Sequence, residues 1–294
     1  MNLVSADQNV LNGLHITFIG AGSIAEALIK GLSETGMSKT AYLHVTNRSN
    51  HERLNDLKAT YPIIAHSDLR DAVLQADILI LCVKPKDVHS VLPLVARHAR
   101  ADALYLSVVA GCSIESMRQM ITSVRTDSGD PHIVRTMPNT SCAVRESATA
   151  YTMSKSCTTR DQSRVEAILH AVGRTYELTE DLLNAVTGLA GSGPAYVYYF
   201  VEALTRAGVD VGLDEATAYA LVLQTLYGAA HMLRASNETP ATLRKRVTSP
   251  GGTTFAGIAT LKQHGFETAV RQAVIRATQR AEELGALLDE EVQV

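Results

Sequence analysis

The sequence lacks the residue spacings that metal sites and disulfide frameworks require. Its 294 residues include four cysteines and ten histidines. The cysteines form no CxxC pair, and the histidines form no HxxxH or HExxH pair. We therefore predict no metal site, and we expect small buried thiols of a reducing compartment rather than disulfides at Cys82, Cys112, Cys142 and Cys157.

Clustered positive charge and a targeting segment are also missing. The formal net charge is -3, and lysine and arginine are spread along the chain, which argues against nucleic-acid binding but not against a small anionic ligand. The first dozen residues have neither a basic region nor an apolar run, so we interpret residues 1–13 as a loose N-terminal extension and not as a signal peptide. We expect a cytoplasmic protein. Residues 216–233 are long enough to span a membrane, but Gln224 and His231 argue against insertion, and we predict no membrane contact.

The first half of the chain alternates short apolar runs with helix-like stretches. Residues 23–32 and 87–98 have the pattern of helices. The run at 78–83 is continuously apolar, as expected for a strand that is buried on both faces of a parallel sheet. Strands alternating with helices predict βαβ units in a doubly wound sheet. The predicted strands are residues 14–19, 41–46, 78–83, 104–109 and 133–137.

The second half has no convincing strand beyond Glu180. Long helical stretches are interrupted by glycine or proline at residues 191–194, 208–213 and 249–252. Residues 216–233 are apolar on nearly all sides, and a small helical domain has few ways to cover such a helix, so we expect a partner subunit to cover it. The sequence predicts an α/β Rossmann-like N-terminal domain (14–178) followed by an all-α C-terminal dimerisation domain (179–294).

A glycine-rich segment directly after the first predicted strand suggests dinucleotide binding. The segment Gly20-Ala21-Gly22-Ser23-Ile24-Ala25 has the form GxGxxA and opens a predicted helix. The first glycine permits a tight turn, the second lets the backbone approach a pyrophosphate at the helix N-terminus, and the alanine allows close packing. The alternative is a glycine turn without a ligand. The expected cofactor contacts are Ile19, Gly20, Ala21, Gly22, Ser23 and Ile24.

The residues after the second predicted strand favour NADPH over NADH. NAD-specific sites usually have a carboxylate there, but this chain has Asn47-Arg48-Ser49. Arg48 can form a bidentate pair with a 2′-phosphate, and Asn47 and Ser49 can donate hydrogen bonds. The alternative is that these three residues only cap the next helix.

Three further strand ends should lie at the same edge of the sheet, where ligands bind in open α/β folds. The small residues at 108–110 would let a nicotinamide ring lie close. Lys84 could instead be a solvated lysine before a proline turn, and Asn139 could be a turn residue that needs no ligand. The expected cofactor contacts at these ends are Val83, Lys84, Pro85, Val108, Val109, Ala110 and Asn139.

Several of these segments together resemble the pyrroline-5-carboxylate reductases. The matching segments are FIGAG (18–22), VKP (83–85), RTMPNT (135–140), AVTGLAGSGPAY (185–196) and VTSPGGTT (247–254), and the last two are highly specific. The resemblance covers nearly the whole chain beyond the N-terminal extension. It departs at Ser141, where the family usually has proline, and we expect a looser turn there.

The resemblance implies an oxidoreductase of amino-acid biosynthesis. The family reduces 1-pyrroline-5-carboxylate to L-proline with NADPH, or more weakly NADH, in the last step of proline biosynthesis. It implies a homodimer interlocked through the helical half, with dimers often building larger rings. It also implies a substrate loop that opens a helix, with Arg246 near the cofactor and Glu180 near the substrate. The expected catalytic residues are Thr254 and Ser249, and the expected substrate contacts are Glu180, Ser249, Gly252, Thr253 and Thr254.

Purely structural roles for several of these residues, and two competing functions for the protein, remain open at this point. Glu180 could be a charge favoured at a helix N-terminus, Arg246 could be an exposed residue of a basic segment, and the loop hydroxyls could cap the helix that follows them. A 3-hydroxyacid dehydrogenase that uses NADP has the same architecture, but its glycine-rich segment with lysine and asparagine is not found here. A reductase-like paralogue that binds dinucleotide without turnover is the non-enzyme alternative.

Overall fold

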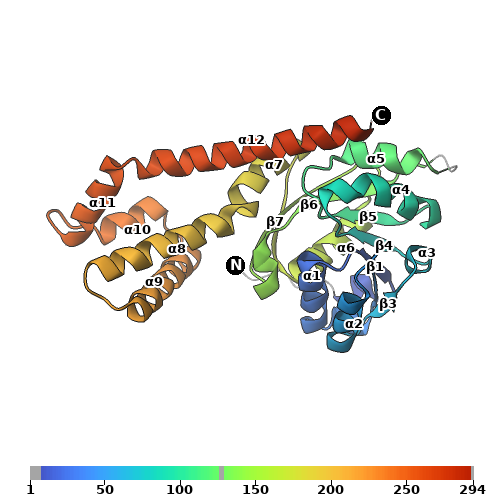
Figure 1. Ribbon diagram of the computed structural model, residues 1–294, viewed down its shortest axis with the longest axis horizontal. Helices are drawn as coiled ribbons and strands as arrows, with labels where there is room; N and C mark the ends of the chain where they lie inside the picture. The colour runs from blue at the N-terminus through green and yellow to red at the C-terminus, as the bar shows by residue number, and fades with distance from the viewer. Residues whose placement is uncertain (1–7, 126–128, 293–294) are drawn as a thin grey trace. The chain divides into compact units, whose positions relative to one another are not determined.

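The computed structural model describes residues 8–125 and 129–292 and contains one eight-stranded sheet (Figure 1). The first six strands along the chain run parallel, β7 is antiparallel to β6, and β8 is parallel to β7. The predicted doubly wound fold is confirmed. In sheet order the strands are β3 (Ile64–His66), β2 (Tyr42–Thr46), β1 (His15–Ile19), β4 (Ile78–Leu81), β5 (Leu104–Ser107), β6 (His132–Met137), β7 (Ser147–Met153) and β8 (Gly173–Glu177).

Helices cover both faces of the sheet. Side chains on alternate positions of β4 enter two different core clusters, so this strand is buried on both sides as its apolar sequence predicts. One cluster contains residues of α1 (Ser23–Glu34), α2 (His51–Thr60) and α6 (Thr159–His170). The other contains residues of α3 (Leu69–Val73), α4 (Val88–His98) and α5 (Ile114–Thr122).

Three strands of the sheet were not identified from the sequence, and each lacks the apolar run that a buried strand shows. β3 has three residues and lies at one edge, while β8 lies at the other edge and carries the polar sequence GRTYE. β7 is built mainly from small and hydroxyl-bearing residues. The sheet ends at Glu177, whereas the chain divides by contacts into two compact units, residues up to Ser192 with those from Ala277 onward, and Gly193–Arg276. A domain boundary at residue 178 therefore remains a prediction.

The described part of the N-terminal extension is not loose. A short 3-10 helix, η1 (Gln8–Leu11), precedes β1, and Leu11 is fully buried in the same core cluster as α1 and α6. The backbone N–H of Gly13 donates to the carbonyl of Thr40 at 2.7 Å. The prediction of a loose extension is wrong for residues 8–13, because one leucine is enough to anchor a short segment to a core. Residues 1–7 lie outside the described residues.

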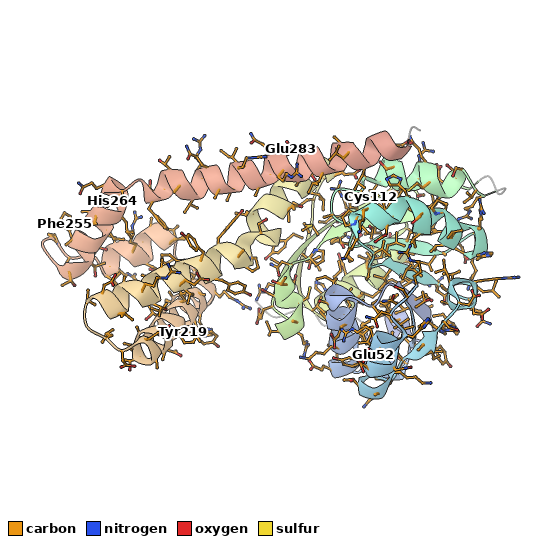
Figure 2. All side chains as sticks on the ribbon, in the orientation of Figure 1. Glu52, Cys112, Tyr219, Phe255, His264 and Glu283 are labelled. Atoms are coloured by element: carbon orange, nitrogen blue, oxygen red, sulfur yellow. The ribbon has the colours of Figure 1, made fainter. Side chains whose placement is uncertain are left out.

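The helical unit, described here by itself, consists of helices only. Helix breaks occur within the three predicted ranges, 191–194, 208–213 and 249–252, whereas the breaks at 236–239 and 264–265 were not predicted. Gly208 lies so close to Ala218 that a Cβ on it would come within 2.9 Å of the alanine Cβ. Within Gly193–Arg276 only Thr205 and Ala218 are buried. Aromatic residues such as Tyr219 and Phe255 are half exposed (Figure 2). The helices are α8 (Gly193–Asp210), α9 (Glu215–Ala235), α10 (Pro240–Arg246), α11 (Thr253–Gln263) and the first part of α12 (Phe266–Val292).

The described helices include none that has the length and apolar character to cross a bilayer. The stretch at 216–233 lies inside α9, which carries Gln224 and His231 among its apolar residues. Like the other helices of this unit, α9 is largely exposed, and Ala218 is its one buried residue in the described chain. An apolar helix left open in a single chain is consistent with the expected cover by a second subunit.

Three histidines form a hydrogen-bonded row across β1, β2 and β3. His15 Nδ1 lies 2.9 Å from His44 Nε2, and His44 Nδ1 lies 2.8 Å from His66 Nε2. The row lines a hollow of about 270 Å³ that also contains Asp71. Burial, followed by the charges of His66 and His15, lowers the pKa of His44 from 6.5 to about 4. His44 is therefore held neutral in the folded protein over a range in which an exposed histidine would be charged.

This row makes the stability of the fold depend on pH. The unfolded chain protonates His44 below about pH 6.5, whereas the folded chain resists protonation down to about pH 4, so the free energy of unfolding should fall as pH drops through that window. We expect His44→Gln to remove about 1–2 kcal/mol of this pH dependence, since Gln keeps a donor and an acceptor but does not titrate. Urea unfolding at pH 7.0, 5.5 and 4.5 measures it. The exposed His264 offers the control His264→Gln, and an unchanged pH slope in the His44 variant would contradict the prediction.

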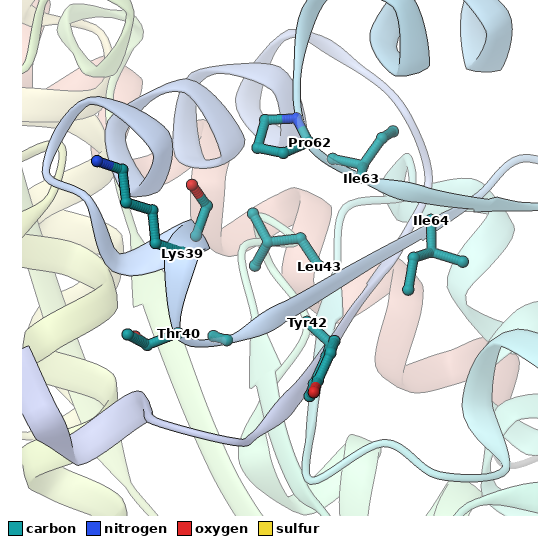
Figure 3. Close-up of a pocket in the computed structure, with 9 residues that line it drawn as sticks. Lys39, Thr40, Tyr42, Leu43, Pro62, Ile63 and Ile64 are labelled. Carbon is teal, nitrogen blue, oxygen red and sulfur yellow. The ribbon is translucent and has the colours of Figure 1, made fainter.

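A second hollow, of about 230 Å³, opens where β2 and β3 begin (Figure 3). Its lining residues include Lys39, Tyr42, Pro62 and Ile64. It lies at the amino-terminal ends of these strands, whereas the glycine-rich turn follows the carboxyl end of β1. The hollow is therefore not part of the predicted cofactor site.

Candidate active site

The glycine-rich turn has the backbone geometry that the sequence predicts. Gly20 follows β1 with a φ of 108°, a conformation that favours glycine. A Cβ on Gly20 would come within 2.6 Å of the carbonyl oxygen of Cys82, and its N–H donates to the carbonyl of Thr46 at 2.9 Å. Glycine is therefore required at position 20, because the ends of β1, β2 and β4 approach one another too closely there for a side chain.

The N-terminus of α1 is open to a ligand. Gly22 is the N-cap residue and supplies no side chain to cap the helix, and both Gly22 and Ser23 are exposed. A Cβ on Gly22 would meet no atom of the described residues within 4 Å, so there is open space beside Gly22. Backbone N–H groups at such a helix start, together with the helix dipole, bind phosphate well. Ile19, Ala21 and Ile24 are buried or half-buried and support the turn from beneath.

Arg53 of α2 braces this turn, a role that the sequence did not reveal. Its Nε donates to the carbonyl of Ala21 at 3.2 Å, and its Nη2 forms an ion pair with Glu26 in the first turn of α1. The positive charge of Arg53 offsets the negative charge of Glu26, which lies close to the open N-terminus of α1 where an anion is expected to bind. It also ties α2 to the glycine-rich turn.

The segment after β2 presents Arg48 to solvent. The side-chain oxygen of Asn47 accepts from the N–H groups of Ser49 and Asn50, both at 3.3 Å. Asn50, not residues 47–49, caps α2, because its side chain accepts from the N–H of Arg53 at 2.9 Å. The capping alternative for residues 47–49 is therefore wrong. Arg48 is exposed and forms no hydrogen bond or ion pair within the described ranges 8–125 and 129–292.

The other strand ends lie along the same carboxyl edge of the sheet. Lys84 and Pro85 are exposed after β4 and lead into η3 (Pro85–Asp87), while Val83 is half-buried. After β5, Val109 is buried and its N–H is held by Ser107 Oγ at 3.2 Å, while Val108 and Ala110 are half-buried. The first unit thus brings the predicted nucleotide contacts from β1, β2, β4 and β5 to one edge.

Glu180 is anchored within the first unit by two donors. Its Oε1 accepts from the backbone N–H of Ile114, the first residue of α5, at 2.8 Å, and from Arg135 Nη1 at 3.1 Å. Arg135 lies in β6 with 6% of its surface exposed, and its Nη2 donates to Asn184 Oδ1 at 3.1 Å. The sequence placed Arg135 inside a family motif but gave no sign of this partner. The alternative of a charge at a helix N-terminus does describe Glu180, although the helix is α5.

The loop before α11, in the helical unit, also ends in an uncapped helix N-terminus. Gly251 has a φ of 72°, and Gly252 is the N-cap residue with no side-chain cap. A Cβ on Gly252 would come within 2.7 Å of Ser249 Oγ. Thr253 and Thr254 are exposed, and in the described part of the chain neither hydroxyl forms a hydrogen bond. The alternative that the loop hydroxyls cap α11 is therefore wrong, and the first N–H groups of the helix are available to an anion.

Comparisons with known proteins match both halves of the chain. Residues 15–111 match the family described as NADP oxidoreductase, coenzyme F420-dependent, and residues 180–284 match the family described as pyrroline-5-carboxylate reductase dimerisation. Pyrroline-5-carboxylate reductase 2 of Bacillus subtilis is 41% identical over 269 residues, which are 92% of this chain and 94% of that protein. The chain belongs to the pyrroline-5-carboxylate reductase family. The resemblance proposed from the sequence motifs is confirmed.

Solved structures of the same family agree with this chain along most of its length. The reductase from Coxiella burnetii superposes with a TM-score of 0.85 at 32% identity, covering 93% of this chain and 99% of that one. The Plasmodium falciparum reductase, solved with NADP bound, has a TM-score of 0.82 at 28% identity and covers 94% of this chain and 99% of that one. The Rossmann and helical halves predicted from the sequence are therefore those of the family.

The departure from the family pattern at Ser141 adds a hydrogen bond. Asn139 caps η4 (Thr140–Val144), and its Oδ1 accepts from the N–H of Ser141 at 3.1 Å, a donor that proline would not have. This hydrogen bond opposes a looser turn, and the expectation of one stays an untested prediction. Asn139 Nδ2 donates to the carbonyl of Ala190 at 3.0 Å, so both ends of this side chain are already engaged. The alternative of a turn residue describes Asn139, and its contact with the cofactor stays a prediction.

In the part of the chain that the structure describes, Arg246 and the four cysteines show no arrangement for binding the cofactor or for thiol chemistry. Arg246 forms an exposed ion pair with Glu238 at 2.7 Å, so its predicted cofactor contact would require an exchange of partners. None of the four cysteines is in a disulfide, and burial raises the pKa of the thiols of Cys82, Cys142 and Cys157, which disfavours the reactive thiolate. Among the residues that the structure describes, no three His, Cys, Asp or Glu side chains could hold a metal ion.

Proposed function

We propose that this protein reduces 1-pyrroline-5-carboxylate to L-proline with NADPH, the last step of proline biosynthesis. The observation that carries the proposal is the 41% identity to a pyrroline-5-carboxylate reductase across 92% of the chain. Two uncapped helix N-termini, one in each unit, support it, since the reaction needs a site for a pyrophosphate and a site for a carboxylate.

The carboxyl edge of the sheet would hold the cofactor. The open N-terminus of α1 fits the pyrophosphate, and Arg48, which has no partner among the described residues, fits a 2′-phosphate, which favours NADPH and leaves NADH as the weaker cofactor. NADPH supplies the hydride when bound. Arg246 and Asn139 are also proposed cofactor contacts, and each would have to exchange a present protein partner for the cofactor. The remaining proposed contacts are Ile19, Gly20, Ala21, Gly22, Ser23, Ile24, Asn47, Ser49, Val83, Lys84, Pro85, Val108, Val109 and Ala110.

The start of α11 would hold the substrate. The N–H groups of its first turn and the hydroxyls of Thr253 and Thr254 can bind the carboxylate, while Ser249 and Gly252 shape the loop. Thr254 and Ser249 act by orienting the ring, because a protonated imine needs no further activation. The protein's contribution is then to fix the imine carbon for hydride delivery and to exclude water.

The helical unit would complete its core with a second copy of the chain. A unit with two buried residues cannot be stable alone, and its exposed apolar side chains require a cover. The family match at 180–284 carries the description dimerisation. We propose a homodimer, with rings of dimers as its larger form, working in the cytoplasm.

One assay tests the proposed reaction. Consumption of NADPH and of NADH is followed with pyrroline-5-carboxylate and, in parallel, with an open-chain keto acid. We expect turnover of the cyclic imine alone, and faster turnover with NADPH. Oxidation of 3-hydroxyisobutyrate would instead indicate a hydroxyacid dehydrogenase, and nucleotide binding without turnover would indicate the non-catalytic paralogue.

The choice of cofactor should depend on Arg48. We expect Arg48→Ala to raise the KM for NADPH by a factor that corresponds to about 1.5–3 kcal/mol, the value of a lost hydrogen bond to a charged group, and to leave the KM for NADH nearly unchanged. Steady-state kinetics with both nucleotides measure this. The exposed Lys58 of α2 provides a control for the loss of charge alone. Equal effects on both nucleotides in the Arg48 variant would exclude this role.

A further inference from the structure

We infer that Glu180 and Arg135 form a positioning pair that fixes the turn between β5 and α5, and through it the nicotinamide half of the cofactor. This inference rests on the proposed function, because it assumes that a nicotinamide dinucleotide binds at this edge. It assigns Glu180 a role through the backbone of the turn, in place of contact with the substrate.

The contact that carries the inference runs from a side chain to the start of a helix. Glu180 Oε1 accepts the N–H of Ile114 at 2.8 Å, and Ile114 is the first residue of α5. The N-cap residue Ser113 already satisfies the N–H of Ser116 at 3.0 Å. Glu180 therefore adds a charged acceptor to a helix N-terminus that has its own cap, which fixes where α5 begins.

The carboxylate of Glu180 is itself held in place by a buried arginine. Arg135 is 6% exposed, extends from the central part of β6, and donates to Glu180 at 3.1 Å and to Asn184 of α7 (Leu183–Val186) at 3.1 Å. Arg135 is buried whereas Glu180 is half-buried, so removing Glu180 would leave a buried guanidinium without its carboxylate partner, which is costly. Arg135 thus links the position of the β5–α5 turn to the sheet.

The same turn is confined on a second side by the last helix. Gly111 has a φ of 81°, and a Cβ on it would come within 3.3 Å of the backbone of Gly285 in α12. Leu288 of α12 packs in the core cluster that contains Val109 and Cys112. The β5–α5 turn is therefore held at its α5 end by Glu180 and at Gly111 by α12, which restricts its movement.

The position of this turn matters for one half of the dinucleotide only. In doubly wound folds one mononucleotide half lies over the β1–β3 side of the sheet and the other over the β4–β6 side. The glycine-rich turn and Arg48 belong to the first side, whereas Val108, Val109 and Ala110 belong to the second. A shift of the β5–α5 turn should therefore disturb the nicotinamide and leave the adenosine half in place.

Binding of two nucleotides to Glu180→Ala tests the inference. We expect the dissociation constant for NADPH to rise by about tenfold and kcat to fall by at least as much, since a displaced ring loses its reactive alignment. The dissociation constant for 2′,5′-ADP, which has no nicotinamide, should stay within about twofold of the wild-type value. Glu180→Gln keeps an acceptor for the N–H of Ile114 and should recover most of the loss.

A variant of Arg135, the ion-pair partner of Glu180, and a matched control complete the experiment. Arg135→Met leaves the Glu180 carboxylate intact, so a similar loss of NADPH affinity in this variant supports action through the pair; if it does not fold, the comparison of Ala with Gln at position 180 decides. Glu115→Ala, on the exposed face of the same α5, should change neither affinity. A raised KM for the imine with unchanged NADPH affinity would overturn the inference and make Glu180 a substrate ligand.

Two other results would also overturn it. Equal weakening of NADPH and 2′,5′-ADP would mean that the pair supports the whole domain, and unchanged affinity with a lowered melting temperature would mean that it is only structural. The nucleotide affinities are measured without imine. A wild-type protein that binds NADPH but reduces no pyrroline-5-carboxylate would therefore contradict the proposed function and leave this test intact.

Discussion

Replacing Leu223 with aspartate is expected to dissociate the protein or to unfold its helical half. Leu223 lies in α9 and is 50% exposed in the single chain, among many other exposed apolar side chains of this unit. If a second copy covers α9, the new carboxylate is buried without a partner, which costs about 3–5 kcal/mol. Sedimentation velocity over a range of concentrations and circular dichroism measure the outcome.

The control for this variant is an equally exposed leucine elsewhere. Leu94 of α4 in the Rossmann unit is 46% exposed, and we expect Leu94→Asp to leave the assembly unchanged. The same sedimentation series on the wild-type protein tests the premise. A stable, active monomer at high dilution would refute the proposed dimer, and with it the expected effect of the Leu223 variant.

Removing the hydroxyl of Thr254 is expected to reduce catalytic efficiency about ten- to 150-fold, the value of one hydrogen bond to a charged group. Stability should change little, because Thr254 is exposed and Gly252, rather than a hydroxyl, stands at the N-cap of α11. The affinity for NADPH should be unaffected, since the proposed nucleotide contacts in the Rossmann unit are retained. The melting temperature, NADPH affinity and kcat/KM of Thr254→Ala are measured together.

A second threonine of the same helix serves as the control. Thr260 of α11 donates its hydroxyl to the carbonyl of Ala256 at 3.0 Å, a bond within the helix. Thr260→Ala makes the same chemical change one to two turns away from the loop and should leave kcat/KM unchanged. A Thr254 variant with wild-type efficiency would exclude a substrate role for this hydroxyl.

The central strands and the nucleotide turn could be predicted because one local signal specifies each of them. The run at 78–83 contains β4, whose alternate side chains fill two cores, and GxGxxA specifies both the positive φ of Gly20 and the open start of α1. β3, β7 and β8 could not be predicted in this way. β3 and β8 lie at the two edges of the sheet and β7 lies beside β8, and their polar or small residues show no buried pattern.

The partners of individual side chains in the candidate site were less predictable than its location. That Asn50 and not Asn47 caps α2 depends on where the helix begins, and a one-residue uncertainty decides it. The bonds of Glu180 join residues that are 45 and 66 positions apart in the sequence. No periodicity or local motif contains such a pairing, so a reactive role and a supporting role for Glu180 could not be separated at that level.

The two hydrogen bonds of the histidine row across β1–β3 must point the same way along the row. A neutral imidazole carries one proton on its two nitrogens, so neutral His44 must donate to one neighbour and accept from the other. If His44 donates to His15, then His66 must donate to His44, and in the other tautomer both bonds reverse together. The tautomers of the three histidines are thus coupled, and replacing His15 or His66 with a residue that can only donate or only accept would fix the tautomer of His44.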